Sequence, residues 1–106
     1  GLDIEKIAPV RRAAARALTI EERKYMEADL ERRFAYLWTR KEAVLKCTGA
    51  GLSQPMSAFS VLGDTASPEG AVISLYTVEY GNYMLSAAAA RSAVFTPQRV
   101  DALELL

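Results

Sequence analysis

The chain contains no histidine and only one cysteine, Cys47. Without histidine, Ser-His catalysis, Cys-His catalysis and histidine-ligated zinc are all excluded within this chain. A single cysteine cannot form an intrachain disulfide, which favours a reducing compartment, so we expect a cytoplasmic protein. Any general base must therefore be a carboxylate, a lysine, a tyrosine or the cysteine.

The chain also lacks an excess of either charge and any long apolar run. Thirteen basic residues balance thirteen acidic ones among 106 residues, so we expect no bulk nucleic-acid binding. No stretch approaches the roughly 20 apolar residues of a membrane span, and no signal peptide is visible. The length suits a single domain, residues 1–106, or half of a larger one. A start at Gly1 is typical of a processed or truncated piece.

The first half of the chain predicts one strand followed by helices. Residues 1–7 alternate in polarity as a strand does, which places Asp3 and Glu5 on one face. The Ala- and Arg-rich segment 10–18 favours a helix because of its residue propensities. A capping box at Thr19-Ile20-Glu21-Glu22 predicts the start of a second helix, which continues to about Leu30. A central helix follows to about Thr48, and Gly49 and Gly51 are expected to end it.

The second half reads mainly as strands. Residues 71–80 are rich in β-branched and aromatic residues, Gly81-Asn82 is a hairpin turn signal, and residues 83–90 return as the partner strand. We also expect a strand at 58–62, a loop at 63–70 and an ambiguous tail after Ser92 that Pro97 breaks. Tyr76, Tyr80 and Tyr83 are explained by cross-strand packing. The order predicts an α+β fold in which a long central helix packs on a small antiparallel sheet.

Charge interrupts the apolar face of the central helix. On a helical wheel at about 100° per residue, Lys41 falls inside this face, while Glu42 and Lys46 lie along one edge, one turn apart. Such charges are costly at the rim of a buried face unless something neutralises them, as a metal ion and a phosphate would. Cys47 lies about 100° from Lys46 and is expected to be a packed thiol. The apolar face itself consists of Phe34, Leu37, Trp38, Val44 and Leu45.

Packing of the helix on the sheet would bring Glu42 to Asp3 and Glu5. Three clustered carboxylates raise one another's pKa values, and a bound Mg²⁺ would relieve their repulsion and bridge to substrate phosphates. Lys41 and Lys46 would then be phosphate partners. The simpler interpretation is that Glu42 and Lys46 form an ordinary i, i+4 salt bridge on the helix. The pattern alone leaves both interpretations open.

Two motifs resemble those of 4′-phosphopantetheinyl transferases. The run from Trp38 to Gly49 resembles the signature W-x-x-K-E-[AS]-x-x-K-x-x-G, and the run from Gly1 to Glu5 resembles the upstream motif G-[IV]-D-[IV]-E. Segments 51–53 and 59–61 and, more weakly, the hairpin around Gly81 are also similar to the family. The tryptophan form looks like the larger, surfactin-synthetase-activating (Sfp-type) subgroup, in which two similar halves form a pseudodimer that binds coenzyme A between them. This chain resembles only the C-terminal half.

The resemblance implies a role for each matched residue. Asp3, Glu5 and Glu42 would ligate Mg²⁺ or Mn²⁺. Glu42 would also act as the base for a carrier-protein serine. Lys46 would be catalytic and would hold the pyrophosphate of the substrate coenzyme A, with Lys41 assisting. The partner would be an acyl or peptidyl carrier protein of lipid or secondary-metabolite biosynthesis.

The resemblance therefore implies magnesium-dependent transfer of 4′-phosphopantetheine from coenzyme A to a carrier-protein serine. We expect this activity to be incomplete in the chain alone, and to need the missing N-terminal half or a second copy in a homodimer. The alternative is a non-catalytic, truncated half-domain that binds carrier protein or nucleotide without turnover. Arg11, Arg12 and Arg16 form either a solvated basic face or a contact for an acidic carrier protein.

Overall fold

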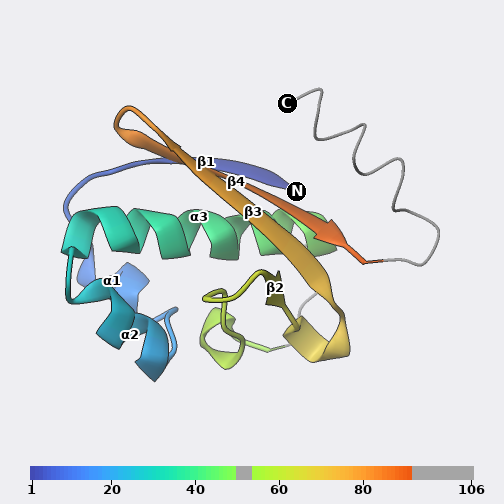
Figure 1. Cartoon of the computed structure of the whole chain (residues 1–106). Helices are drawn as coiled ribbons and strands as arrows, with labels where there is room; N and C mark the ends of the chain where they lie inside the picture. Colours follow the sequence, from blue (N-terminus) through green and yellow to red (C-terminus); the bar gives the residue numbers. More distant parts are fainter. Residues whose placement is uncertain (50–53, 92–106) are drawn as a thin grey trace.

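A computed structural model describes residues 1–49 and 54–91 of the chain. Its elements are β1 (Leu2–Lys6), α1 (Arg12–Ala15), α2 (Ile20–Met26), α3 (Leu30–Thr48), the 3₁₀ helix η1 (Met56–Ala58), β2 (Thr65–Ala66), the 3₁₀ helix η2 (Pro68–Gly70), β3 (Ile73–Tyr80) and β4 (Tyr83–Ala90). The four strands form one antiparallel sheet in the order β1-β4-β3-β2. The sheet lies along one side of the long helix α3 (Figure 1), which confirms the predicted α+β class.

Helix α2 begins at the predicted capping box. The backbone N–H of Glu22 donates to the Thr19 hydroxyl at 3.1 Å, and the Glu22 carboxylate accepts from the backbone N–H of Thr19 at 2.7 Å. The helix ends at Met26, earlier than expected, and α3 starts separately. Only four residues of the predicted helix 10–18 are helical, because α1 has no side-chain cap and no buried residue to support it.

Glycines with positive φ angles end helix α3 and form the turn between β3 and β4. Gly49 ends α3 with a left-handed φ of 71°, as expected, while Gly51 lies outside the described residues. Gly81 turns the β3–β4 hairpin at a φ of 59°, and Tyr80 pairs with Tyr83 on either side of it. The predicted hairpin is therefore confirmed.

The strand predicted at residues 58–62 is wrong. After η1 the chain runs on without a strand neighbour, and side chains of α3 bind its carbonyls instead: Lys41 reaches Phe59, and Arg40 reaches Val61. The short strand β2 instead lies within the predicted loop 63–70, where it pairs with β3. The family-like segment 51–53 and the tail after Ser92 lie outside the described residues.

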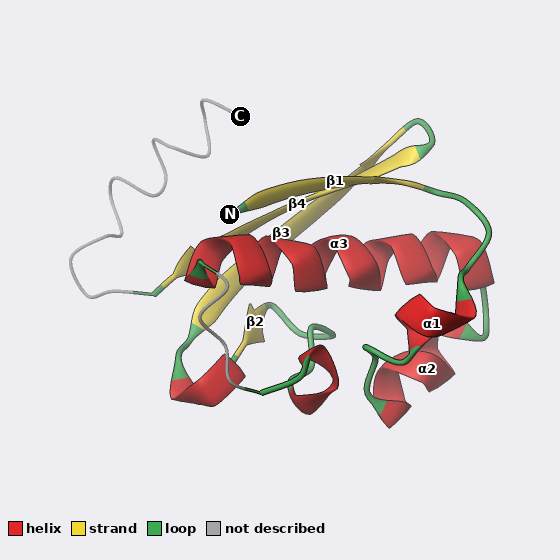
Figure 2. Ribbon diagram, turned by 180° about the vertical axis from the view of Figure 1, so that it is seen from behind, coloured by secondary structure: helices red, strands yellow, loops and turns green. Residues whose placement is uncertain are grey.

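Helix α3 is covered on two sides rather than one. The sheet covers one side, while α1, α2 and the segment from η1 to β2 cover the other (Figure 2). Its residues are consequently buried nearly all the way around, including the charged Arg40 and Lys41. The main hydrophobic cluster joins both layers and consists of Leu18, Met26, Leu37, Ala43, Val44, Phe59, Val61, Ala66, Ile73, Leu75 and Ala88.

No helix in the described part of the chain has the length and apolar character needed to cross a membrane.

Candidate functional site

Strand β1 and the C-terminal half of α3 lie in direct contact. The Thr39 hydroxyl of α3 donates to the backbone carbonyl of Asp3 at 3.1 Å. Just before β1, a side-chain carbon on Gly1 would lie 2.6 Å from the backbone nitrogen of Cys47 and closer still to the carbonyl oxygen of Ala43. Only glycine fits at this position, because any side chain would push the strand and its acidic residues away from the helix.

This contact brings the first acidic residue of β1 to a lysine of α3. Asp3 is only 8% exposed, and its Oδ1 accepts a hydrogen bond from Lys46 Nζ at 2.8 Å. Its other oxygen, Oδ2, is buried and has no hydrogen-bond partner among the described residues. A buried carboxylate oxygen without a partner is uncommon in folded proteins and points to a missing donor or cation.

Glu5 and Glu42 share the environment of Asp3. Burial raises the pKa of Glu5 to about 7, helped by the neighbouring carboxylates of Asp3 and Glu42. Burial and the charge of Asp3 also raise the pKa of Glu42 above its usual value. The hydrogen bond to Asp3 raises the pKa of Lys46. The four groups therefore form one electrostatic cluster, in which carboxylate charge exceeds lysine charge.

The chemistry of this cluster fits a hard divalent cation. Three carboxylates, one of which has the partnerless Oδ2 of Asp3, offer oxygen ligands of the kind that Mg²⁺ and Mn²⁺ prefer. Within residues 1–49 and 54–91, however, no three acidic, cysteine or histidine side chains converge closely enough to hold a metal ion as they stand. Lys46 Nζ lies at Asp3 Oδ1, where it partly neutralises the excess negative charge.

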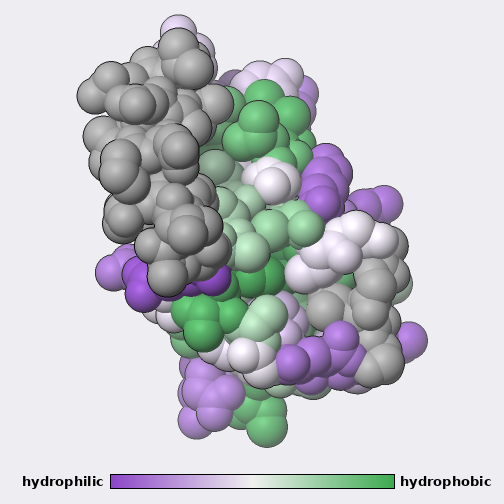
Figure 3. Space-filling view, turned by 90° about the vertical axis from the view of Figure 1, so that its right-hand side faces the viewer, coloured by the Kyte–Doolittle hydropathy of each residue, from purple (hydrophilic) through white to green (hydrophobic). Residues whose placement is uncertain are grey.

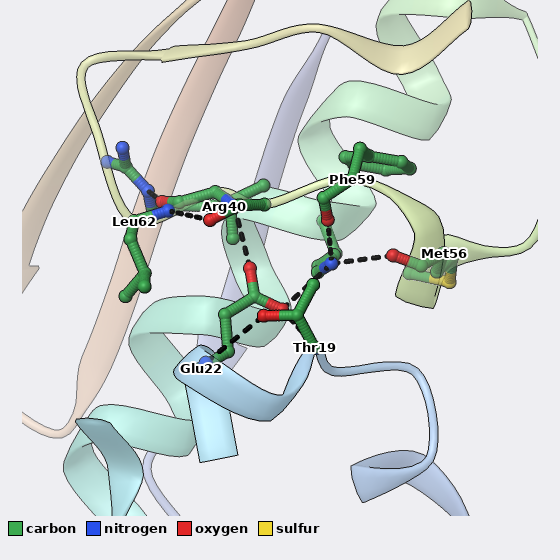
Figure 4. A network of polar contacts seen from close by, with 9 residues as sticks. Thr19, Glu22, Arg40, Met56, Phe59 and Leu62 are labelled. Carbon is green, nitrogen blue, oxygen red and sulfur yellow. Dashed lines mark hydrogen bonds and ion pairs between the residues drawn. The ribbon is translucent and has the colours of Figure 1, made fainter. Parts of the chain in front are cut away.

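Lys41 is not part of this cluster. Its side chain has no exposure, and its Nζ lies 3.0 Å from Oε1 of Glu22 and donates to the carbonyls of Met56 and Phe59 at 2.6 and 2.5 Å (Figure 4). Burial lowers the pKa of Lys41 below its usual value. These contacts lie on the side of α3 opposite the sheet. The geometry speaks against the expected assistance of Lys41 in holding a pyrophosphate, because the ammonium is enclosed and already has three partners.

Three consecutive residues of α3 therefore contact three different parts of the molecule. Arg40 donates from Nε to the Val61 carbonyl and from Nη1 to the Thr77 hydroxyl, both at 2.8 Å, and from Nη2 to the carbonyl of Gly63. Lys41 binds α2 and the η1 segment, and Glu42 faces β1. Sequence reasoning missed Arg40 and also Thr39, although Thr39 precedes Glu42 by three residues and so lies on the same side of the helix.

Beside the cluster, the outer face of the sheet is apolar and hollowed. A hollow of about 390 Å³ is lined by residues of β1, β3 and β4, together with Lys46. Figure 3 shows hydrophobic surface in the middle of the side where β1 begins and α3 ends. Contiguous apolar surface of this kind commonly marks a site of protein association. The residues that line the hollow are Leu2, Asp3, Ile4, Lys46, Tyr76, Val78, Leu85, Ser86 and Ala87.

A second hollow, of about 400 Å³, lies on α1 and α2 and is basic. Arg12, Arg16 and Arg23 line it together with Glu27 and two apolar residues. None of the three arginines forms an ion pair within the described ranges. Helices α1 and α2, which carry this hollow, lie beside the N-terminal half of α3 (Figure 1), whereas the carboxylate cluster involves Glu42 and Lys46 of its C-terminal half.

The remaining residues singled out in the sequence have structural surroundings. Cys47 is half-buried and packs against the hydrophobic core, as expected for a packed thiol. Trp38 stacks on Phe34 with ring centroids 5.8 Å apart. Across the hairpin Tyr76 pairs with Ala87 and Tyr80 pairs with Tyr83, but Tyr76 and Tyr80 both remain more than half exposed on the sheet.

The comparison with known families agrees with the two motifs. A family model described as the 4′-phosphopantetheinyl transferase superfamily matches residues 1–88. No curated protein matches the chain. The matched region contains all of β1 and α3, and with them the four residues of the cluster. Because the match extends over most of the 106 residues, the chain belongs to the 4′-phosphopantetheinyl transferase superfamily.

Proposed function

We propose that this chain is the C-terminal half of an Sfp-type phosphopantetheinyl transferase, which transfers 4′-phosphopantetheine from coenzyme A to a carrier-protein serine. The observation that carries the proposal is the cluster of Asp3, Glu5, Glu42 and Lys46 between β1 and α3. Family membership supports phosphopantetheinyl transfer in general, and the cluster supplies groups suited to that reaction.

Each residue of the cluster has a task in this proposal. Asp3, Glu5 and Glu42 would hold Mg²⁺, which supplies charge neutralisation for the phosphates of coenzyme A when bound. Glu42 accepts the proton of the carrier serine as the general base. The serine oxygen then forms a bond to the β-phosphorus, and the bond from that phosphorus to adenosine 3′,5′-bisphosphate breaks. Lys46, which is half-exposed, holds the pyrophosphate.

The proposed site is open on one side. Asp3 and Lys46 line the apolar hollow on the outer face of the sheet, so whatever covers that face also forms a wall of the site. We infer that the missing N-terminal half, or a second copy of the chain, fills this position. The enclosed position of Lys41 removes one cation from the pyrophosphate site, which makes a second wall with its own cations more necessary. A cytoplasmic location remains a prediction.

Transfer can be measured with the chain, coenzyme A, Mg²⁺ and an apo carrier protein, by weighing the carrier in a mass spectrometer. The dilute chain is expected to label the carrier poorly or not at all. Any transfer at high chain concentration should require Mg²⁺ and disappear in Glu42→Gln. Efficient transfer by a dilute monomer would contradict the incomplete site. Transfer that persists in Glu42→Gln would contradict the assigned base.

The alternative, a half-domain without turnover, is favoured by one observation. Carboxylates do not converge on a metal position within the described ranges, and Lys46 already holds Asp3. Mn²⁺ titration by calorimetry separates the two functions, with Glu42→Gln measured alongside. A transferase site should bind Mn²⁺ and lose at least tenfold in affinity in the variant. Equal affinity in both proteins would reject the cluster as a metal site.

A further inference from the structure

A row of buried polar groups runs along the inner face of the sheet toward Asp3. Arg40 Nη1 donates to the Thr77 hydroxyl at 2.8 Å, and the Thr77 and Ser86 hydroxyl oxygens lie 2.8 Å apart. Arg40 and Ser86 are 3% and 2% exposed and Thr77 is half-buried, so these contacts are largely shielded from water. The row crosses from α3 to β3 and then to β4. It ends on the strand that pairs with β1.

The positive charge of Arg40, at one end of this row, determines which way the hydroxyl protons of Thr77 and Ser86 point. A guanidinium only donates hydrogen bonds, so the Thr77 oxygen accepts from Arg40. The positive charge favours a Thr77 hydroxyl proton that points away from it, toward the Ser86 oxygen. Successive hydroxyls polarise one another in the same sense. The proton of Ser86 then points onward, away from Arg40.

Asp3 lies directly across the strand pair from Ser86. Gly1 and Ala88, two pairs further along, exchange both backbone hydrogen bonds at 2.7 and 2.8 Å. Alternation along an antiparallel pair makes Asp3 and Ser86 a pair of the same type, with side chains adjacent on the inner face and Cβ atoms roughly 5 Å apart. In the described part of the chain, Asp3 Oδ2 is the one buried side-chain oxygen without a partner.

We propose that Ser86 is a positioning residue for Asp3. Its hydroxyl, oriented by Thr77 and Arg40, donates to Oδ2 of Asp3 directly or through one bridging water, while Lys46 holds Oδ1. The spacing of the pair suits one water, which bridges such groups nearly as well as a direct bond. The carboxylate is thereby fixed at both oxygens and keeps the orientation in which it faces Glu5 and Glu42.

The first test needs no metal and no activity. A double-mutant cycle in urea, with EDTA present, compares Ser86→Ala, Asp3→Ala and the double variant. The combined effect on the unfolding equilibrium constant should differ from the product of the single effects by at least threefold. A smaller coupling would overturn the proposal, because independent sites combine within about twofold. Thr77→Val in place of Ser86→Ala should couple to Asp3 in the same direction.

A serine on the opposite face of the sheet provides the matched control. Ser74 also accepts a hydrogen bond from an arginine, Arg91, at 2.8 Å. It lies on β3 and faces away from Asp3. The cycle with Ser74→Ala should therefore show less than twofold coupling to Asp3. Coupling as large as that of Ser86 would also overturn the proposal, since it would reflect a general response of the sheet.

A second measurement connects Ser86 to the proposed function, on which this part rests. Groups that orient metal ligands typically change metal affinity by 10- to 100-fold when removed. Ser86→Ala should lower Mn²⁺ affinity at least tenfold, Ser86→Thr should restore most of it, and Ser74→Ala should leave it unchanged. Equal affinity in Ser86→Ala and the wild-type protein would overturn the positioning role. If the wild-type protein binds no Mn²⁺, the proposed metal site fails, and the metal-free cycle alone decides on Ser86.

Discussion

Lys41 Nζ lies 3.0 Å from Glu22 Oε1, and neither side chain has any exposure to solvent. The same Glu22 carboxylate caps α2 at Thr19 and accepts from the backbone N–H of Val61 at 2.7 Å. The pair therefore joins α3, α2 and the η1 segment in one buried contact. Its removal should affect stability, whereas its distance from the carboxylate cluster leaves it no direct part in phosphate binding.

Lys41→Met should destabilise the protein by about 3–5 kcal/mol, because it leaves the buried carboxylate of Glu22 without its cation. Urea unfolding measures this change. The matched control is Lys24→Met on the exposed side of α2, which should change the free energy of unfolding by less than about 0.5 kcal/mol. A Lys41→Met protein as stable as the control would show that the ion pair is not formed in solution.

The stability of the metal-free protein should decrease as pH rises from about 4.5 to 7. The pKa of Glu5 is about 7 in the folded protein and near 4.5 in the unfolded chain, so the folded state binds more protons in this window. The loss should reach roughly 1–3 kcal/mol above pH 7. Urea unfolding at pH 5 and pH 8 in EDTA measures it.

Glu5→Gln should remove most of this pH dependence, since the amide does not ionise. Glu31→Gln, at an exposed position on α3, is the control and should keep it. Stability that rises with pH in the wild-type protein would contradict the raised pKa of Glu5.

The apolar outer face of the sheet should cause the chain to self-associate. Leu2 and Ile4 on β1 and Tyr76 and Val78 on β3 are between 41% and 60% exposed there, on either side of β4. Sedimentation velocity should show association that increases with concentration and that Val78→Lys weakens. Ile20→Lys, at a residue 68% exposed on α2, is the control and should leave association unchanged. A stable monomer at high concentration would count against this interface.

The arginine hollow on α1 and α2 should bind acidic surface on the carrier protein. Arg12→Glu combined with Arg16→Glu should lower carrier affinity at least threefold at low salt, and the difference should shrink as salt is added. Surface plasmon resonance with immobilised carrier measures both effects. Lys24→Glu, also on α2 but outside the lining of the hollow, provides the control. Equal losses in both proteins would favour a solvated basic face.

The parts of the fold that depend on nearby residues could be predicted from the sequence. The Thr19–Glu22 capping box, the glycine end of α3 and the Gly81 hairpin each depend on a few consecutive residues, and each is present. The grouping of Asp3 and Glu5 on one face follows from the two-residue period of a strand.

The errors come from contacts between distant segments. A helical wheel assumes one apolar face, so it could not show that α3 is covered on both sides and that Lys41 belongs to the far layer. The segment around Phe59 resembles a strand in composition, yet its carbonyls are taken by Arg40 and Lys41 rather than by a neighbouring strand. Ser86 carries no signal in the sequence, because its position opposite Asp3 depends on the pairing of β1 with β4.

The contacts of Arg40, Lys41 and Glu42 with three separate parts of the molecule make α3 sensitive to its length. Inserting or deleting one residue near its middle would rotate everything beyond that point by about 100°. Either Arg40 and Lys41 would lose their hydrogen bonds to the carbonyls of residues 56–63, or Glu42 and Lys46 would no longer face β1. A single-residue change in helix length should therefore be more damaging than any one of the substitutions above, and the spacing of these residues is as much a part of the site as their identities.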